Sequence, residues 1–300
     1  MNKQSGRYRF KVFLAVFLFW VLVPQSLLFA GDLAEIKESG KLRHLGIPYA
    51  HFVSGNHDSG LDIEMMKLFA AHLGVEYVFV ESNWSDIIAD LTGKKVQPKG
   101  DNIQVVGESP VRGDVIATGF TILPWREKIV NFSTPTFPSG IWLIARADSK
   151  LKPIAESNSV DHDIAMVKSQ LKNISVLTLA DSCLAPELYG LDETGSQIHL
   201  FDSTRNLDEM IPAIMSGVAE STLIDVPVAL VALETWPGTI KVIGPISPLQ
   251  TMGYAFSKES PELREAFNTF FAQRQQDGTY RKLVEKYYPT VFTYYGDFFK

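Results

Sequence analysis

The chain has 300 residues, of which 46% are hydrophobic and 21% charged, and its formal net charge is −6 at pH 7. This acidic balance argues against nucleic acid as a partner, because phosphate binding needs an excess of Lys and Arg. The single cysteine, Cys183, has no partner in the chain for a disulfide. Stability must therefore come from a hydrophobic core, and the length is ample for one or two of ordinary size.

The first thirty residues have the order of a secretory signal peptide. Four basic residues precede an apolar run from Val12 to Val23, and the segment ends in Ala30. The twelve residues of the run are too few for a comfortable membrane span. An uncleaved anchor helix stays open as an alternative, because Leu28 is a poor fit to the small residue expected there. Cleavage would remove four positive charges, take the net charge from −6 to −10, and leave a mature protein in the periplasm.

Short apolar runs alternate with helical patterns along the rest of the chain, which indicates an α/β protein. The first half is predicted to contain strands at residues 42–50, 75–81 and 113–119 and helices at 61–74 and 84–93. Between them, residues 94–112 are polar and rich in turn residues. We expect this stretch to be an inserted loop or hairpin.

A second, similar cycle begins at about residue 144. Its predicted elements are helices at 163–172, 207–217 and 226–234 and strands at 174–180, 198–202, 221–225 and 240–245. A strong helix follows, with Pro261 at its first position and Ser260 able to cap it, and a shorter helix covers residues 280–288. Tandem βα cycles predict two doubly wound lobes, with ligands at the carboxyl ends of the strands and a cleft where the lobes face each other.

Four segments, in this order, resemble the polar amino acid group of periplasmic solute-binding proteins, the bacterial extracellular solute-binding family 3. They are GKLRHLGIPYAHF (40–52), GDVIATGFTILPWREKIVNFSTPTFPSGIWLIARADS (113–149), GVAESTLIDVPVAL (217–230) and DGTYRKLVEKYYP (277–289). The resemblance covers nearly the whole mature chain and implies a type II periplasmic binding fold. Residues 31–145 plus 249–300 would then form lobe 1 and residues 146–248 lobe 2, joined by a two-strand hinge.

The same resemblance implies contacts to the polar ends of a ligand. Arg126 falls on the position that grips a ligand carboxylate, and Thr121 on the hydroxyl that shares it, two residues after the motif glycine Gly119. Asp225 falls on the acid that takes a ligand ammonium. This division of labour makes physical sense, because a guanidinium can hold a carboxylate with two parallel hydrogen bonds.

Further matches concern the walls of the cleft. Tyr49 matches a ring stacked on the ligand, and Trp84 matches a second wall position. Ser182 lies near the second-lobe loop that offers amides to the carboxylate, although DSCL replaces the usual glycine and threonine pair there. Leu123 stands where many members carry a second threonine. These departures leave room for a ligand that is not a standard amino acid.

Each of these residues also has a structural interpretation. Arg126 could be a surface arginine paired with Glu127 or Asp114. Asp225 could only cap the helix that follows it, Thr121 could be an ordinary strand residue, and the two aromatic residues could belong to a core. The lone cysteine is expected to be a small buried side chain rather than a nucleophile.

The resemblance implies a monomeric receptor that closes on an amino acid or similar small carboxylate and delivers it to an ABC importer. Such a protein catalyses no reaction, needs no cofactor or metal, and binds a membrane permease but not nucleic acid. His57 and Asp58 lack the spacing for a metal site. Two alternatives stay open: a periplasmic enzyme similar to cyclohexadienyl dehydratase, which needs a general acid in the cleft, and a sensor that passes the closed form to a membrane receptor.

Overall fold

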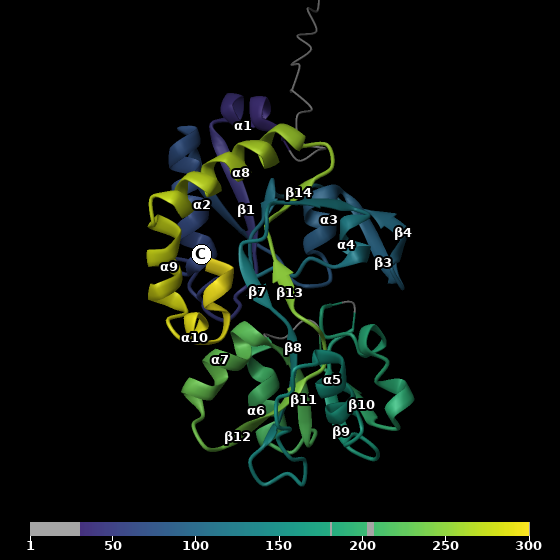
Figure 1. Cartoon of the computed structure of the whole chain (residues 1–300). Helices are drawn as coiled ribbons and strands as arrows, with labels where there is room; N and C mark the ends of the chain where they lie inside the picture. Colours follow the sequence, from purple (N-terminus) through teal and green to yellow (C-terminus); the bar gives the residue numbers. More distant parts are fainter. Residues whose placement is uncertain (1–30, 181, 203–206, 300) are drawn as a thin grey trace, which may run out of the picture.

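Residues 31–180, 182–202 and 207–299 are described by the computed structural model. The signal peptide predicted at residues 1–30 lies outside them. The described chain forms two α/β lobes, drawn one above the other in Figure 1. Strands β7 (Phe137–Ser139) and β13 (Gln250–Met252) lie between the lobes and pair antiparallel. The predicted fold class, two doubly wound lobes joined by a two-strand hinge, is confirmed.

The first lobe is built on a sheet with the strand order β2-β1-β5-β14-β6. Its strands are β1 (Lys41–Gly46), β2 (Glu76–Glu81), β5 (Val115–Ile116), β6 (Val130–Phe132) and β14 (Ala255–Ser257). Strand β1 runs parallel to β2 and β5, while β14 runs antiparallel to β5 and β6. Its helices are α1 (Leu33–Ser39), α2 (Leu61–Leu73), α3 (Ile87–Thr92), α4 (Pro124–Glu127), α8 (Pro261–Gln276), α9 (Thr279–Tyr287) and α10 (Val291–Tyr295).

The second lobe is built on a sheet with the order β10-β9-β11-β8-β12. Its strands are β8 (Ile141–Arg146), β9 (Ser175–Thr178), β10 (Gln197–Leu200), β11 (Ser221–Asp225) and β12 (Ile240–Pro245). Its helices are α5 (Val160–Lys168), α6 (Met210–Met215) and α7 (Val226–Thr235). Short 3-10 turns are η1 (Pro186–Tyr189), η2 (Asp192–Thr194) and η3 (Leu207–Glu209), and η4 (Gly296–Phe299) follows α10 in the first lobe. All five residues of β11 are buried, as expected for a strand between two neighbours with helices on its faces.

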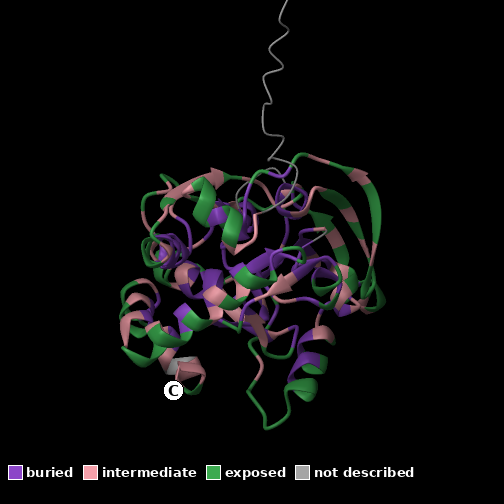
Figure 2. Ribbon diagram, turned by 90° about the horizontal axis from the view of Figure 1, so that it is seen from above, coloured by how far each residue is buried: buried purple, intermediate pink, exposed green. Residues whose placement is uncertain are grey.

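The chain crosses between the lobes through the two paired strands. It leaves the first lobe through β7 and enters β8, and it returns after β12 through β13. Buried residues run through the middle of the molecule while exposed residues cover its rim (Figure 2). The division at residues 145 and 248 stays a prediction, and β8 from residue 141 onward lies in the second sheet.

The inserted stretch forms the predicted hairpin, with β3 (Lys94–Lys99) paired antiparallel to β4 (Asn102–Glu108). It extends from one side of the first lobe (Figure 1). The amide of Ser109 donates to the carbonyl of Gly93 at 2.9 Å, so the two ends of the hairpin lie next to each other.

Helix boundaries differ from the predicted ones where side chains supply caps. Helix α5 begins at Val160, three residues early, because Ser159 accepts a hydrogen bond from the His162 amide at 3.3 Å. Ser260 does precede α8, but a distant residue satisfies the amides of the first turn. Asp32 accepts a hydrogen bond from Leu263 N at 2.8 Å across 231 positions of sequence, which no local pattern could indicate.

Candidate ligand site between the lobes

Arg126 lies inside the protein, on a single helical turn that Pro124 starts. The residue is 2% exposed, and its Nη1 donates to the carbonyl of Thr121 at 2.8 Å. The guanidinium carbon is 3.9 Å from the centre of the Phe120 ring. Its Nε has no hydrogen-bond partner among the described residues. Burial lowers the pKa of Arg126 to about 10, still far above neutrality, so the group is a buried cation.

The surface interpretation of Arg126 is excluded by this burial. The suggested partner Asp114 is engaged by Arg43, whose backbone amide and Nε donate to the carboxylate at 2.8 and 3.1 Å. No ion pair to Arg126 is found in the part of the chain that the structure describes. Burial of a guanidinium without an anionic partner costs free energy, because the lost hydration is not replaced by an ion pair.

Two residues of the second lobe lie close to this guanidinium. Cys183 and Tyr189 each raise the pKa of Arg126, against the larger effect of burial. The Tyr189 hydroxyl donates to the Cys183 carbonyl at 2.5 Å and accepts from Gln250 Nε2 at 3.2 Å. Burial raises the pKa of the Cys183 thiol, which is buried as predicted. The hinge strand β13 and the loop of the second lobe therefore meet at Arg126.

Thr121 is an isolated bridge residue paired with Met252, and it is 1% exposed. Its Oγ1 is buried without a hydrogen-bond partner at normal distance, although it lies near enough to Cys183 to lower the pKa of that thiol. The Thr121 hydroxyl and Arg126 Nε thus lie on two residues that contact each other, and neither atom has a partner at hydrogen-bond distance among the described residues.

Asp225 ends β11 and caps α7, with its Oδ1 accepting from the Val228 amide at 3.3 Å. The capping interpretation is therefore confirmed, but the cap uses only one of the two carboxylate oxygens. Its Oδ2 accepts a hydrogen bond from the hydroxyl of Tyr49 in the first lobe. Asp225 is 1% exposed, and burial raises its pKa to about 7.

Tyr49 belongs to a cluster of rings. It stacks on Phe52 with centroids 6.0 Å apart and meets Trp84 edge-on at 5.3 Å. Tyr49 is buried and Trp84 half-buried, and Trp84 Nε1 has no hydrogen-bond partner among the described residues. The two rings predicted for the wall do lie together, and their contact with a ligand stays a prediction.

Gly119 supports this ring cluster from behind. Its φ of +59° is in the left-handed region, and a Cβ there would lie 2.5 Å from Phe52 and 3.0 Å from Tyr49. The Gly119 amide donates to Asp62 at 2.7 Å, and Tyr254 donates to the other oxygen of that carboxylate at 2.7 Å. Glycine is required because a side chain would displace the rings.

Ser182 shapes the loop on the opposite side. Its hydroxyl donates to the Leu179 carbonyl at 2.8 Å and accepts from the Leu184 amide at 3.0 Å, and the residue is 3% exposed. A ligand contact from Ser182 stays a prediction. Leu123, at the position of the missing threonine, is buried.

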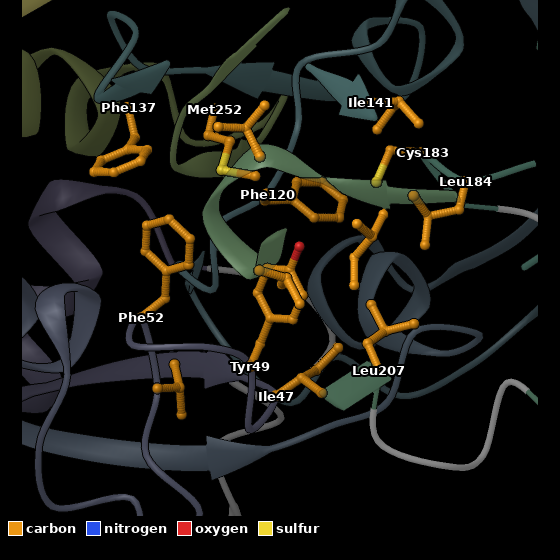
Figure 3. Close-up of a cluster of buried hydrophobic side chains, with 14 of the residues drawn as sticks. Ile47, Tyr49, Phe52, Phe120, Phe137, Ile141, Cys183, Leu184, Leu207 and Met252 are labelled. Atoms are coloured by element: carbon orange, nitrogen blue, oxygen red, sulfur yellow. The ribbon is translucent and has the colours of Figure 1, made fainter. Parts of the chain in front are cut away.

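Buried apolar side chains from both lobes gather around Tyr49 (Figure 3), and Phe120 among them lies against the Arg126 guanidinium. We call them the apolar wall, which consists of Ile47, Phe52, Phe120, Leu184, Leu207 and Met252. Sequence reasoning missed the wall and also Tyr189 and Gln250. No local signal points to these residues, because what places them together is the approach of one lobe to the other.

Two other kinds of site are not found within residues 31–180, 182–202 and 207–299. No group of three or more His, Cys, Asp or Glu side chains could hold a metal ion. No helix in these ranges is long and apolar enough to cross a bilayer.

Two α/β lobes connected by two paired strands define the fold of the type II periplasmic binding proteins, and a buried arginine lies near the residues where the lobes meet. The chain belongs to the bacterial extracellular solute-binding proteins, family 3, whose sequence profile matches residues 110–290. The family resemblance predicted from four sequence segments is confirmed.

Curated relatives include binding proteins and an enzyme. The chain is 25% identical to the L-cystine-binding protein TcyJ of Escherichia coli K12, over 94% of this chain and 96% of TcyJ. It is also 25% identical to the histidine-binding periplasmic protein of Salmonella typhimurium, over 83% and 86% of the two chains. A membrane-bound lytic murein transglycosylase F of Desulfosudis oleivorans is 24% identical over 88% of this chain, which spans only 52% of the length of that enzyme.

Solved structures of similar fold include amino acid-binding proteins. The P235GK mutant of ArgBP from T. maritima aligns with a TM-score of 0.67 and 25% identity, over 86% of this chain and 99% of that one. An ancestral amino acid-binding protein, AncCDT-1, described as a precursor of cyclohexadienyl dehydratase, aligns with a TM-score of 0.64 and 25% identity, over 85% and 98%.

Proposed function

We propose that this chain is an exported receptor that closes on an amino acid or a similar small carboxylate and delivers it to an ABC importer, without catalysing a reaction. The observation that carries this proposal is the buried guanidinium of Arg126, which has an unused Nε and no acidic partner in the described residues. A charge in such a place is tolerated when an anion completes its hydrogen bonds. Relatives that carry binding functions in their names support the same conclusion.

The proposal gives each residue of the site a role. Arg126 and Thr121 bind the carboxylate of the ligand, and Tyr49 and Trp84 form its walls. Asp225 contributes from the opposite lobe. Because the binding groups belong to different lobes, the ligand favours the closed arrangement through its higher affinity for that state. Gly119 and Ser182 hold the two rims in shape. The receptor works as a monomer in the periplasm, with a membrane permease as its partner.

A thermal-shift screen tests the proposal. The mature protein is melted against amino acids, small carboxylates and amines, and a true ligand is expected to add roughly 2.7 kcal/mol of stability at about a hundredfold excess over its dissociation constant. An Arg126→Gln variant should lose that shift. Arg281→Gln, which removes an exposed arginine paired with Glu285, is the matched control and should keep it.

Either of two results would contradict the proposed receptor function. One is a melting temperature that no member of the screen changes. The other is an Arg126→Gln variant that binds a confirmed ligand as tightly as the wild type.

A second candidate function is a dehydratase on the same scaffold. The observation in its favour is Asp225, a buried carboxyl whose pKa is raised to about 7, as a general acid requires. The ancestral relative described as a precursor of cyclohexadienyl dehydratase points in the same direction. Incubation with prephenate, followed by absorbance, separates the two functions: turnover that Asp225→Asn abolishes would establish the enzyme, and absence of turnover favours the receptor.

A further inference from the structure

The carboxylate that a ligand ammonium would use is already engaged by the chain. Asp225 Oδ2 accepts the hydroxyl of Tyr49, and Oδ1 accepts the amide of Val228. The residue is 1% exposed, so no water supplements these contacts from bulk solvent. An ammonium group arriving here would have to displace the tyrosine hydroxyl before it could pair with the acid.

A second buried carboxylate near the ring cluster, Asp62, is engaged as well. Asp62 is held behind the ring cluster, with one oxygen bound by the Gly119 amide and the other by the Tyr254 hydroxyl. Asp208, near the backbone of Ala50, is exposed rather than buried, so it lies outside this dry environment. The two buried acids, Asp225 and Asp62, are therefore both used to hold the protein together.

The opposite is true at the carboxylate end. Arg126 Nε and Thr121 Oγ1 are both buried and both lack a hydrogen-bond partner in the described chain. Each is a donor of hydrogen bonds, and Arg126 carries a full charge. The site thus offers unused donors for one anion, whereas the carboxylate of Asp225 is engaged. Gln250 Oε1 is a buried acceptor without a partner among the described residues, but Gln250 binds Tyr189 and so lies at the Arg126 end of the site.

The apolar residues around the site strengthen the effect of this difference between unused donors and an engaged carboxylate. The apolar wall supplies side chains without hydrogen-bond acceptors, as Figure 3 shows. An ammonium group buried against such a surface without a free acceptor loses its hydration with no compensation. A hydrocarbon or aryl group in the same place gains from burial.

Building on the proposed function, we propose that the site is selective for a small monocarboxylate with an apolar body and no ammonium group, and that the Tyr49 hydroxyl is the group that excludes the ammonium. Tyr49 occupies the acid from the first lobe and so performs the bridging that a zwitterion's ammonium would otherwise perform. Two features then produce the selectivity: the Asp225 carboxylate is already occupied by Tyr49, and the donors Arg126 Nε and Thr121 Oγ1 are free to bind a carboxylate.

Matched pairs of ligands test this inference. Titration calorimetry near neutral pH compares L-leucine with isocaproate and L-phenylalanine with hydrocinnamate, so that the members of each pair differ in the ammonium group alone. The deaminated acid is expected to bind the wild type at least about tenfold more tightly. In Tyr49→Phe the acid loses its donor, and the ratio should move at least about tenfold towards the amino acid.

Tyr77→Phe is the control, because it removes a hydroxyl that contacts His44 within the first-lobe sheet and should leave the ratio unchanged. Amino acids that bind the wild type more tightly than their deaminated partners would overturn this inference and leave the proposed function intact. The wild-type ratio suffices for that conclusion even where Tyr49→Phe does not fold. If no member of either pair binds, the inference fails, and the proposed function is then judged by the wider thermal-shift screen alone.

Discussion

Tyr49 of the first lobe donates a hydrogen bond to Asp225 of the second lobe, although 176 positions of sequence separate them. Both residues are at most 2% exposed, so the bond lies in a dry interface where it is not weakened by water. Asp225 also caps α7, so a single carboxylate joins the start of that helix to the facing lobe. Because of this link, the protonation state of Asp225 affects both the stability of α7 and the closure of the two lobes.

Replacement of Arg126 by methionine separates binding from folding. The apo form is expected to be at least as stable as the wild type, because a desolvated charge is removed and the apolar stem is kept. Ligand affinity should fall about a hundredfold or more, since each charged hydrogen bond nets roughly 1.5 to 3 kcal/mol. Urea unfolding and calorimetry measure the two effects. A variant that is much less stable yet still binds would contradict the assigned role.

The raised pKa of Asp225 predicts a pH dependence of stability. Between its ordinary value of 3.8 and about 7, the folded protein holds a proton that the unfolded chain releases. The contribution of Asp225 to stability is therefore greatest at acid pH, is lost as the pH rises towards 7, and changes little above that. The limiting slope for one proton is about 1.4 kcal/mol per pH unit.

The measurement must be a comparison, because other groups titrate in the same window. Burial raises the pKa of Asp62 to about 7 and lowers that of His44 to about 4, and the His44 effect has the opposite sign. The free energy of unfolding of the wild type minus that of Asp225→Asn should decrease from about pH 5 to about pH 7.5. Asparagine can keep both contacts, because its Oδ1 can accept from the Val228 amide and its Nδ2 can donate to the Tyr49 hydroxyl, which then accepts instead of donating. A flat difference would show that Asp225 is ionised in the folded protein.

Gly119→Ala tests the packing behind the rings. Alanine at a positive φ costs roughly 1 kcal/mol, and overpacking of the rings at 2.5 Å should add about 1 to 3 kcal/mol. Gly40→Ala is the matched control, since Gly40 has a φ of +67° and no heavy atom lies within 4 Å of the position that its Cβ would occupy. If Gly119→Ala and Gly40→Ala lose equal free energy of unfolding in urea, the rings of Phe52 and Tyr49 move aside without cost.

Removal of the β3–β4 hairpin tests whether the insertion takes part in binding. Residues 95–107 can be replaced by a two-residue turn, because Gly93 and Ser109 are already hydrogen-bonded to each other. Val105 and Val106 are about half exposed, and only Val96 and Ile103 pack partly against the core, so the melting temperature should change by a few degrees. Loss of ligand binding with an intact fold would instead assign the hairpin to the site.

The sequence alone predicted the fold and the elements well where the pattern is local. The boundaries of β11 and β12 and the hairpin at residues 94–112 follow from hydrophobic runs and turn residues, which act through neighbours in the chain. Its predictions were weaker where side chains from afar supply the contacts, as with Asp32 at the start of α8.

By itself the sequence determined that the chain is a two-lobed α/β protein of family 3, and that Arg126 and Asp225 occupy notable positions. Only the tertiary structure decided that Arg126 is buried with an unused donor, that Asp225 is bound by Tyr49, and that apolar side chains of both lobes gather around Tyr49. The reason is physical. Motifs report local backbone needs, whereas the pairing of donors and acceptors depends on how two distant surfaces come together.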